Sequence, residues 1–305
     1  MPSYAFFKKK FVPLAEAKIS VMTHALHYGT ALFEGIRGNW NEAEKQIYIF
    51  RLKEHYERLL SGCRLLKIEL PHSVDDLCQL TVELVGKCAF DEDIYIRPLA
   101  YKSSEALGVR LHNLENDFLV FAIPWGRYLD MDTCTCCVST WRRPDDNVIP
   151  PQLKITGIYI NNAFTKTEAQ ENGFDEGIML SPDGHVSEGS GENIFLAIDG
   201  QLVTPPVYSS ILVGITRDTV IKLAKNELGI VTVERPVDRS ELYTASECFL
   251  TGTAAHVTPV SQIDRRQIGD GGIGEITGKL QKLYFDVIQG KNAKYRHWCT
   301  PAYKK

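Results

Sequence analysis

The sequence lacks the features that mark nucleic-acid-binding, secreted and membrane-spanning proteins. Its 305 residues carry a formal net charge of only −4, and the lysines and arginines are scattered apart from short clusters such as residues 8–10. No basic surface for nucleic acid or anionic membrane is therefore expected. No window approaches the roughly 18 apolar residues of a transmembrane helix, and the N-terminal stretch has no apolar run long enough for a signal peptide. These absences favour a cytoplasmic protein without nucleic-acid or membrane partners.

The cysteines are too irregularly spaced to form a disulfide framework. Eight cysteines in a chain of this length indicate free thiols in a reducing compartment. Cys134 and Cys137 have the spacing of a redox pair, but they lie in TCTCCVSTW, whose alternating β-branched residues are typical of a strand. A redox pair should instead open a helix. We therefore interpret both as ordinary strand residues, and we predict no metal site.

What the sequence does contain is enough apolar content for two cores. Hydrophobic residues make up 44% of the chain, which at this length predicts two domains. Strand and helix patterns alternate along the first third, and the second half adds short strands joined by Pro-Asp-Gly and Asp-Gly turns, as in an antiparallel meander. The predicted fold class is α+β, with two α/β domains and largely antiparallel sheets. The expected bounds are residues 1–124, a linker at 125–133, and 134–305.

Apolar periodicity and turn residues place the main elements. Ser73 is the expected N-cap of one helix, and Gly229 the expected C′ residue that closes another. Helices are expected at 52–66, 73–87, 155–173, 214–229 and 275–290, and strands at 46–50, 93–102, 117–125 and 136–141. A further buried strand and turn are expected at 247–260, and the tail from Lys291 has no predicted role.

Three weak signals point to an anion-binding site. A helix beginning at Gly214 would leave the N–H groups of Ile215 and Thr216 at its positive end, although Thr216 could equally be a plain N-cap. The turn TGTAA at 251–255 is built of small residues, which let backbone approach a ligand or simply form a tight turn. Arg58 lies off the apolar stripe of its helix and is a candidate phosphate ligand, although most such arginines are only solvated. None of the three is specific alone.

Several segments together carry a family resemblance. They are YIRP at 95–98, the lysine in PPQLKITGIY, NGFDEGIML, SEGSGENIF, LVGITRD and TGTAAHVTPV, and HALHYGTALFEGIR near the N-terminus matches as well. In this order they resemble the branched-chain amino acid aminotransferases, class IV enzymes of fold-type IV that use pyridoxal 5′-phosphate (PLP). The resemblance implies transfer of the amino group of L-leucine, L-isoleucine or L-valine to 2-oxoglutarate. The products would be branched-chain 2-oxo acids and L-glutamate.

The resemblance also assigns cofactor contacts. Lys154 matches the lysine that binds the cofactor covalently and moves the proton at the substrate Cα. Glu188 matches the carboxylate that keeps the pyridine nitrogen protonated, which would explain a glutamate in a glycine-rich bend before an apolar strand. Tyr159 matches the tyrosine that hydrogen-bonds the cofactor O3′, or it is simply a core tyrosine. The three weak signals become one phosphate site, formed by Arg58, the N–H groups of Ile215 and Thr216, and Thr253.

A substrate pocket shared between two subunits is implied as well. Substrate carboxylates would be held by Tyr95, Arg97 and the N–H groups of Thr253 and Ala254. Arg97 could instead pair with an acidic neighbour and only support its strand. The side-chain pocket would be lined by Phe33, Tyr28, Val109 and Trp125. Tyr28 and the loop carrying Val109 would come from the neighbouring subunit, so a homodimer or an assembly of dimers is expected.

Other functions of the same fold are alternatives. The motif YIRP is carried by the L-selective members of the family, which disfavours a D-amino acid or (R)-amine transaminase. Aminodeoxychorismate lyase is disfavoured because it resembles this chain less at SEGSGEN. A phosphate-ligand-binding protein without turnover is disfavoured by the presence of both Lys154 and Glu188. Ile158 and the loop 103–113, which contains Arg110 and His112, depart from the family pattern. These departures bear on which amino acid is preferred.

Overall fold

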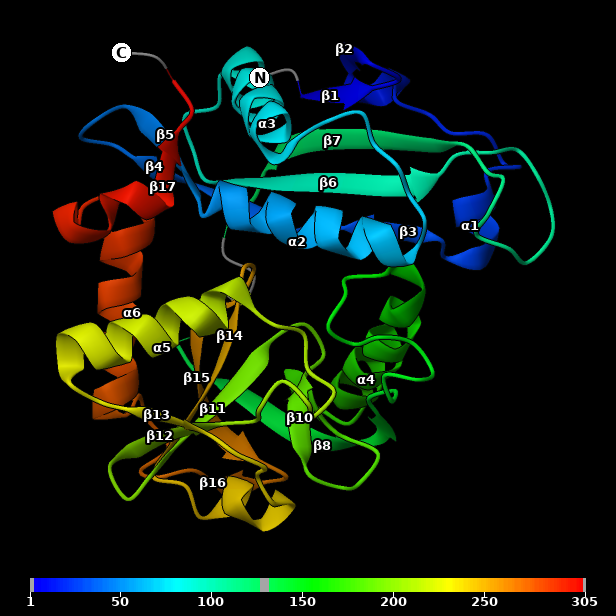
Figure 1. Cartoon of the computed structure of the whole chain (residues 1–305). Helices are drawn as coiled ribbons and strands as arrows, with labels where there is room; N and C mark the ends of the chain where they lie inside the picture. Colours follow the sequence, from blue (N-terminus) through cyan, green and yellow to red (C-terminus); the bar gives the residue numbers. More distant parts are fainter. Residues whose placement is uncertain (1–2, 127–131, 304–305) are drawn as a thin grey trace. The chain divides into compact units, whose positions relative to one another are not determined.

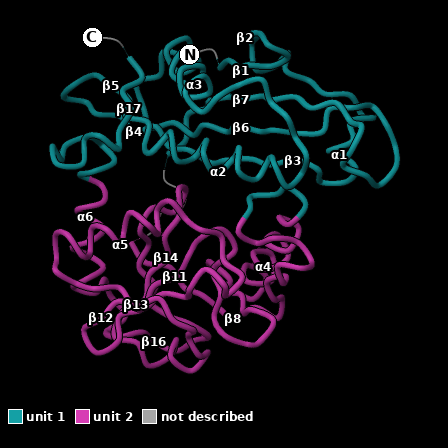
Figure 2. Tube along the Cα trace, viewed as in Figure 1, with its two compact units in different colours: residues 1–126, 153–157, 286–305 teal, residues 127–152, 158–285 magenta. Residues whose placement is uncertain are grey.

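The computed structural model describes residues 3–126 and 132–303, and the chain divides into two compact units (Figures 1 and 2). Unit 1 comprises residues 1–126, 153–157 and 286–305, and unit 2 comprises residues 127–152 and 158–285. These bounds differ from the expected domains, because residue 155 and the strand at 299–301 pair with residues of unit 1. Residues 127–131 of the expected linker lie outside the described part of the chain.

Within its described residues, unit 1 contains an eight-stranded antiparallel sheet in the order β17-β5-β4-β6-β7-β1-β2, with β3 paired to β6 (Figure 1). The strands are β1 (Tyr4–Phe7), β2 (Lys10–Pro13), β3 (Ala31–Phe33), β4 (Ile36–Asn41), β5 (Gln46–Phe50), β6 (Ile94–Lys102), β7 (Asn116–Pro124) and β17 (Cys299–Pro301). The short helix α1 (His24–Tyr28) precedes β3. The strands expected at 46–50, 93–102 and 117–125 are therefore confirmed within one residue at each end.

Two longer helices pack against this sheet. α2 (Leu52–Leu65) contacts β3 and α3 (Val74–Cys88), and α3 contacts β1 and β7. The face that α2 buries includes Leu52, Tyr56, Leu59 and Cys63, which is the stripe that apolar spacing predicts. Ser73 caps α3 and forms a capping box with Asp76, so the expected N-cap is confirmed.

Unit 2 is built on a nine-stranded sheet within its described residues, in the order β10-β9-β8-β15-β14-β11-β12-β13, with β16 paired to β15. Its pairs are antiparallel except for β8 with β9, β8 with β15, and β12 with β13. The strands are β8 (Cys134–Arg142), β9 (Glu176–Leu180), β10 (Val186–Gly189), β11 (Asn193–Ile198), β12 (Gln201–Thr204), β13 (Thr232–Glu234), β14 (Glu247–Gly252), β15 (His256–Ile263) and β16 (Arg266–Gln267). The helices are α4 (Tyr159–Glu171), α5 (Ile215–Leu228) and α6 (Glu275–Ile288). The predicted α+β class with largely antiparallel sheets is confirmed.

The helix expected over 155–173 is shorter than predicted. Thr156–Ile158 form a 3-10 turn, and α4 begins only at Tyr159. Ile155 bridges to Leu32, and Thr156 Oγ1 donates a hydrogen bond to the Gly29 carbonyl at 2.9 Å. The backbone of 153–157 therefore belongs to unit 1 and cannot join the helix. Gly229 closes α5 in the left-handed conformation, as expected.

Strand β8 contains the CTCC segment, so the interpretation of these cysteines as strand residues is confirmed. All eight cysteines are free thiols, and seven of them are buried. The sulfur atoms of Cys134 and Cys136 lie 3.9 Å apart on one side of the strand. None of the helices formed by residues 3–126 and 132–303 has the length and hydrophobicity to cross a membrane.

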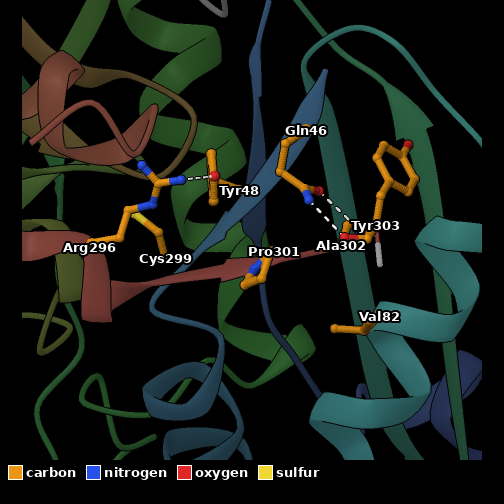
Figure 3. Close-up of a pocket in the computed structure, with 8 residues that line it drawn as sticks. All are labelled: Gln46, Tyr48, Val82, Arg296, Cys299, Pro301, Ala302 and Tyr303. Atoms are coloured by element: carbon orange, nitrogen blue, oxygen red, sulfur yellow. Dashed lines mark hydrogen bonds between the residues drawn. The ribbon is translucent and has the colours of Figure 1, made fainter. Parts of the chain in front are cut away.

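The C-terminal tail forms an edge of the unit 1 sheet. The 3-10 helix η4 (Ala293–Trp298) leads into β17, which pairs with β5. Gln46 Nε2 donates to the Tyr303 carbonyl at 2.8 Å, and Gln46 Oε1 accepts from the Tyr303 N–H at 2.8 Å (Figure 3). A cavity of about 450 Å³ is lined by tail residues, β5 and Val82 of α3 (Figure 3). The tail thus extends the sheet of unit 1.

Candidate active site

Two cationic side chains of unit 1 meet at the ring of Phe33, the last residue of β3. The guanidinium carbon of Arg97 lies 4.5 Å from the centre of this ring, and Lys154 Nζ lies 5.0 Å from it. Backbone pairing holds the lysine here, because the Phe33 N–H donates to the Lys154 carbonyl at 3.1 Å. Arg97 Nη2 donates to Tyr95 Oη at 2.8 Å. The structure therefore brings together four residues that the sequence assigned to the site.

Trp125 joins this group through Tyr95. The two ring centres lie 4.7 Å apart, and a Cβ on Gly35 would lie 2.2 Å from Tyr95 Oη, so Gly35 makes room for the tyrosine. The buried Arg37 donates to the carbonyls of Trp125 and Gly126 at 2.6 and 2.8 Å. The wall formed by Phe33, Tyr95 and Trp125 is thus fixed by backbone pairing on one side and by Arg37 on the other.

Arg97 has no ion pair with any carboxylate of the described residues, and its Nε has no hydrogen-bond partner among them. Arg97 contacts the Tyr95 hydroxyl and the faces of the Phe33 and Tyr95 rings. The alternative in which Arg97 pairs with an acidic neighbour therefore finds no support. A half-buried guanidinium beside aromatic rings is suited to an anionic ligand.

Arg58 projects from α2 toward Glu34, which directly follows β3. Arg58 Nε and Nη2 each donate to the Glu34 carboxylate at 2.7 Å. Tyr28 and Val109 lie elsewhere in unit 1, on α1 and in the loop before β7. Tyr28 Oη accepts from the Gly108 N–H at 3.0 Å, and the neighbouring Val109 side chain is 90% exposed. The structure thus joins Tyr28 to the loop that carries Val109.

In unit 2, the buried carboxylate of Glu188 contacts Arg143, Asn193 and the Leu212 N–H. It lies on β10, and its side chain forms an ion pair with Arg143 Nη2 at 3.0 Å. Its Oε2 accepts from Asn193 Nδ2 at 2.9 Å and from the Leu212 N–H at 3.0 Å. A carboxylate fixed in this way is held ionised and in one orientation.

Asn193 also connects Glu188 to the start of α5. Its Nδ2 donates to the Leu212 carbonyl at 2.9 Å, and its Oδ1 would lie 2.0 Å from a Cβ on Gly214. Gly214 is the N-cap of α5, and no side chain caps this end, so Thr216 is not the cap. Ile215 and Thr216 form the first turn of this 14-residue helix, whose positive dipole end favours an anion.

The TGTAA turn lies against the glycine-rich bend at residues 187–192, which contains Glu188. Thr253 and Ala254 stand between β14 and β15, and a Cβ on the preceding Gly252 would meet Glu192 Cγ and the Gly191 carbonyl at 3.3 Å. Glu192 is buried, and this burial together with the nearby charges of Glu176 and Glu188 raises its pKa to about 8. Unit 2 therefore gathers Glu188, the start of α5 and this turn around one bend.

Tyr159 is the first residue of α4 and is half-buried. One turn later, Asn162 Oδ1 accepts from Arg143 Nη1 at 3.1 Å, which ties the start of α4 to the partner of Glu188. Ile158, a departure from the family pattern, is buried at the N-cap of α4. This departure therefore concerns a buried residue that directly precedes Tyr159.

Sequence reasoning missed the residues that hold the candidate site residues in place. They are Glu34, Arg37, Arg143 and Asn193. Except for Arg143, each is a polar or charged residue within or beside an apolar run, as in LFEGIR and GENIFL. Such residues are rarely buried without a partner. This signal could have marked them, although not their partners.

Comparison with known proteins bears out the resemblance. Residues 31–263 match the family model described as amino-transferase class IV. A probable branched-chain-amino-acid aminotransferase of Aquifex aeolicus is 51% identical over 99% of this chain and 97% of its own. A branched-chain aminotransferase from Thermoproteus uzoniensis with norvaline superposes with a TM-score of 0.95 at 40% identity, covering 99% of this chain and all of that one.

A second solved structure shares the fold as closely. It is the branched-chain amino acid aminotransferase from Thermobaculum terrenum in its PLP form, with a TM-score of 0.94 and 39% identity over 99% of both chains. The sequence motifs and the fold therefore agree. The chain belongs to the class IV aminotransferases.

Proposed function

We propose that the chain is a branched-chain-amino-acid transaminase, which transfers the amino group of L-leucine, L-isoleucine or L-valine to 2-oxoglutarate. The observation that carries this proposal is the wall around Phe33, where Arg97 lies over aromatic rings without an acidic partner among the described residues. Such a wall can pack a branched aliphatic side chain and can also bind the second carboxylate of glutamate. One enzyme needs both properties to accept both substrates.

The cofactor is PLP, and the residues of each unit fit its chemistry. The start of α5 has no side-chain cap, and at Gly214 a Cβ would collide with Asn193, as expected where a phosphate is bound by backbone N–H groups. The buried Glu188 suits a protonated ring nitrogen. When bound, PLP supplies an electron sink for the carbanion formed at the substrate Cα. The residues that would hold it are Lys154, Glu188, Tyr159, Arg58, Ile215, Thr216 and Thr253.

Each residue of the proposed site has its own role in the reaction. Lys154 Nζ removes the proton from the substrate Cα as a general base and later returns a proton as a general acid. Glu188 keeps the ring nitrogen protonated, and Arg143 and Asn193 keep Glu188 ionised and oriented. Substrate carboxylates are bound by Tyr95, Arg97 and the N–H groups of Thr253 and Ala254. Phe33 and Trp125 pack the aliphatic group.

A second copy of the chain is part of the proposal. Apolar side chains of two neighbouring segments are exposed, namely Ile19, Val21, Leu26, Leu107 and Val109. His24 Nε2 and the Gly108 carbonyl lie 3.0 Å apart, so these segments form one surface. An exposed apolar surface of this kind marks an interface, and a homodimer would place Tyr28 and Val109 against the partner. We also propose a cytoplasmic location, which the eight free thiols support.

Borohydride reduction of the purified protein with PLP, followed by peptide mass spectrometry, tests the site. The expected result is cofactor fixed to Lys154. Lys154→Ala should lose turnover of L-leucine and keep the thermal unfolding midpoint, whereas Lys53→Ala on the exposed face of α2 should keep both. Cofactor fixed to any other lysine would refute the assignment.

A further inference from the structure

Glu34 is a buried carboxylate that is bonded to two side chains of α2, His55 and Arg58. It is 1% exposed and follows β3 directly. Arg58 Nε donates to its Oε1, Arg58 Nη2 donates to its Oε2, and His55 Nδ1 lies 2.7 Å from the same Oε2. His55 and Arg58 stand three residues apart on one face of α2. The carboxylate is therefore bonded to two side chains of one helix face.

Glu34 is ionised in spite of its burial. Burial alone would raise its pKa, but the charge of Arg58 and the hydrogen bonds from His55 and Arg58 outweigh this effect and lower the pKa to about 2. An ionised carboxylate only accepts hydrogen bonds, so His55 must donate through Nδ1. Burial, followed by the charges of Arg58 and Lys154, lowers the pKa of His55 against the effect of Glu34. His55 is thus neutral at neutral pH, and the ion pair is formed by Glu34 and Arg58.

The dipeptide Phe33–Glu34 connects this ion pair to Lys154. The Phe33 N–H donates to the Lys154 carbonyl, and the Lys154 ammonium lies over the Phe33 ring. The Glu34 N–H donates to the Pro98 carbonyl at 3.0 Å, which fixes the dipeptide to β6. Two adjacent residues therefore set the positions of Arg58 and Lys154 in unit 1.

We propose that Glu34 is a positioning residue for phosphate binding, which acts by holding Arg58 in the orientation that binds the phosphate group of PLP. The proposal rests on the proposed function. A free arginine side chain loses much rotamer entropy when it is fixed. Because the Glu34 carboxylate binds both Nε and Nη2, the Arg58 guanidinium is already held in one orientation. The negative charge of Glu34 opposes phosphate binding, but its effect on the orientation of Arg58 is larger.

Equilibrium dialysis of the full-length protein against PLP and against pyridoxal, which lacks the phosphate, tests this role. Glu34→Gln keeps the shape of the side chain but removes its charge and one acceptor oxygen. We expect PLP to bind roughly tenfold more weakly or worse, with little change for pyridoxal. Glu57→Gln, an exposed carboxylate on α2, should bind both ligands as the parent does. Equal losses for both ligands would reduce Glu34 to a structural residue, and tighter PLP binding would show that its charge dominates.

A double-mutant cycle with Arg58→Ala separates positioning from other effects. If Glu34 acts through Arg58, Glu34→Gln should cause no further loss of PLP affinity in the Arg58→Ala background. An equal loss in both backgrounds would overturn the proposal. If Glu34→Gln does not fold, Arg58→Lys is used instead. Lysine keeps the positive charge but cannot form the two-point contact with Glu34. Unchanged PLP affinity of Arg58→Lys would then overturn the proposal. A parent protein that does not bind PLP would instead refute the proposed function itself.

Discussion

Glu34 in unit 1 and Glu192 in unit 2 are both buried carboxylates, yet they differ in charge. Glu34 has two donors on α2, and these hold its pKa at about 2. Glu192 accepts from the Gly191 N–H at 3.0 Å and has no ion pair with a cation of the described residues. Burial and the charges of Glu176 and Glu188 raise its pKa to about 8. Burial therefore does not decide ionisation; the neighbouring charges do.

The difference follows from how charges are matched in each unit. In unit 2, Arg143 pairs with Glu188 and Lys166 pairs with Glu176 at 2.8 Å, which leaves Glu192 as the unmatched acid of the cluster. In unit 1, Arg58 is matched by Glu34, whereas Arg97 has no carboxylate partner among the described residues. An unmatched acid becomes neutral, whereas an arginine stays charged and can bind an anionic substrate. Of Glu192 and Arg97, only Arg97 therefore carries a charge that can bind an anionic substrate.

Replacing the two glutamates of the bend one at a time should sharpen this comparison most. Glu188→Gln should lower kcat roughly a thousandfold, about 4 kcal/mol of activation free energy, because a neutral amide cannot keep the ring nitrogen protonated. Glu192→Gln replaces a neutral acid by a neutral amide near neutral pH and should change kcat little. Steady-state kinetics with L-leucine and 2-oxoglutarate measure both. An equal loss of kcat in both variants would show that catalysis requires the intact bend rather than the charge of Glu188.

Acid unfolding tests the ionised side of the comparison. The pKa of Glu34 is lowered from 4.5 to about 2, so its stabilising contribution is complete above pH 4.5 and is lost as the pH falls toward 2. The contribution is on the order of 3 kcal/mol. Urea unfolding at pH 6 and pH 3 should therefore show a smaller loss of stability for Glu34→Gln than for the parent. Glu57→Gln should match the parent, and an identical loss in all three proteins would contradict the low pKa.

Arg97→Leu removes the unmatched cation. It should lower kcat/KM for 2-oxoglutarate roughly thirtyfold more than for L-leucine, about 2 kcal/mol, because only the former brings a second carboxylate into the pocket. Arg64→Leu, an exposed arginine on α2, is the control and should leave both values unchanged. Equal losses for the two substrates would instead assign Arg97 to the carboxylate that both share.

A second test by unfolding at different pH values concerns the neutral acid, Glu192. The folded pKa of Glu192 lies above its usual value, so ionisation opposes folding and the parent should lose stability as the pH rises from about 4.5 to 8. With the pKa raised from 4.5 to about 8, the loss is on the order of 5 kcal/mol. Glu192→Gln should lack this part of the pH dependence in urea unfolding at pH 5 and pH 8. An unchanged pH dependence would mean that Glu192 is ionised in the folded protein.

The sequence predicted local features well because local chemistry determines them. The capping box at Ser73, the close of α5 at Gly229 and the limits of β5 depend on neighbouring residues only. The pairs Glu34–Arg58 and Arg143–Glu188 join residues 24 and 45 positions apart, so they exist only once the chain has folded. For the same reason, the sequence predicts a helix for residues 155–157, although their partners are Leu32 in β3 and Gly29 after α1.

The absorbance spectrum of the purified protein with PLP tests the central claim most directly. Adding L-leucine should bleach the yellow colour of the bound cofactor, and adding 2-oxoglutarate afterwards should restore it, because the amino group is first stored on the protein and then passed on. Lys154→Ala should show neither change. A parent protein whose spectrum does not respond to L-leucine, L-isoleucine or L-valine would contradict the assignment of a branched-chain transaminase.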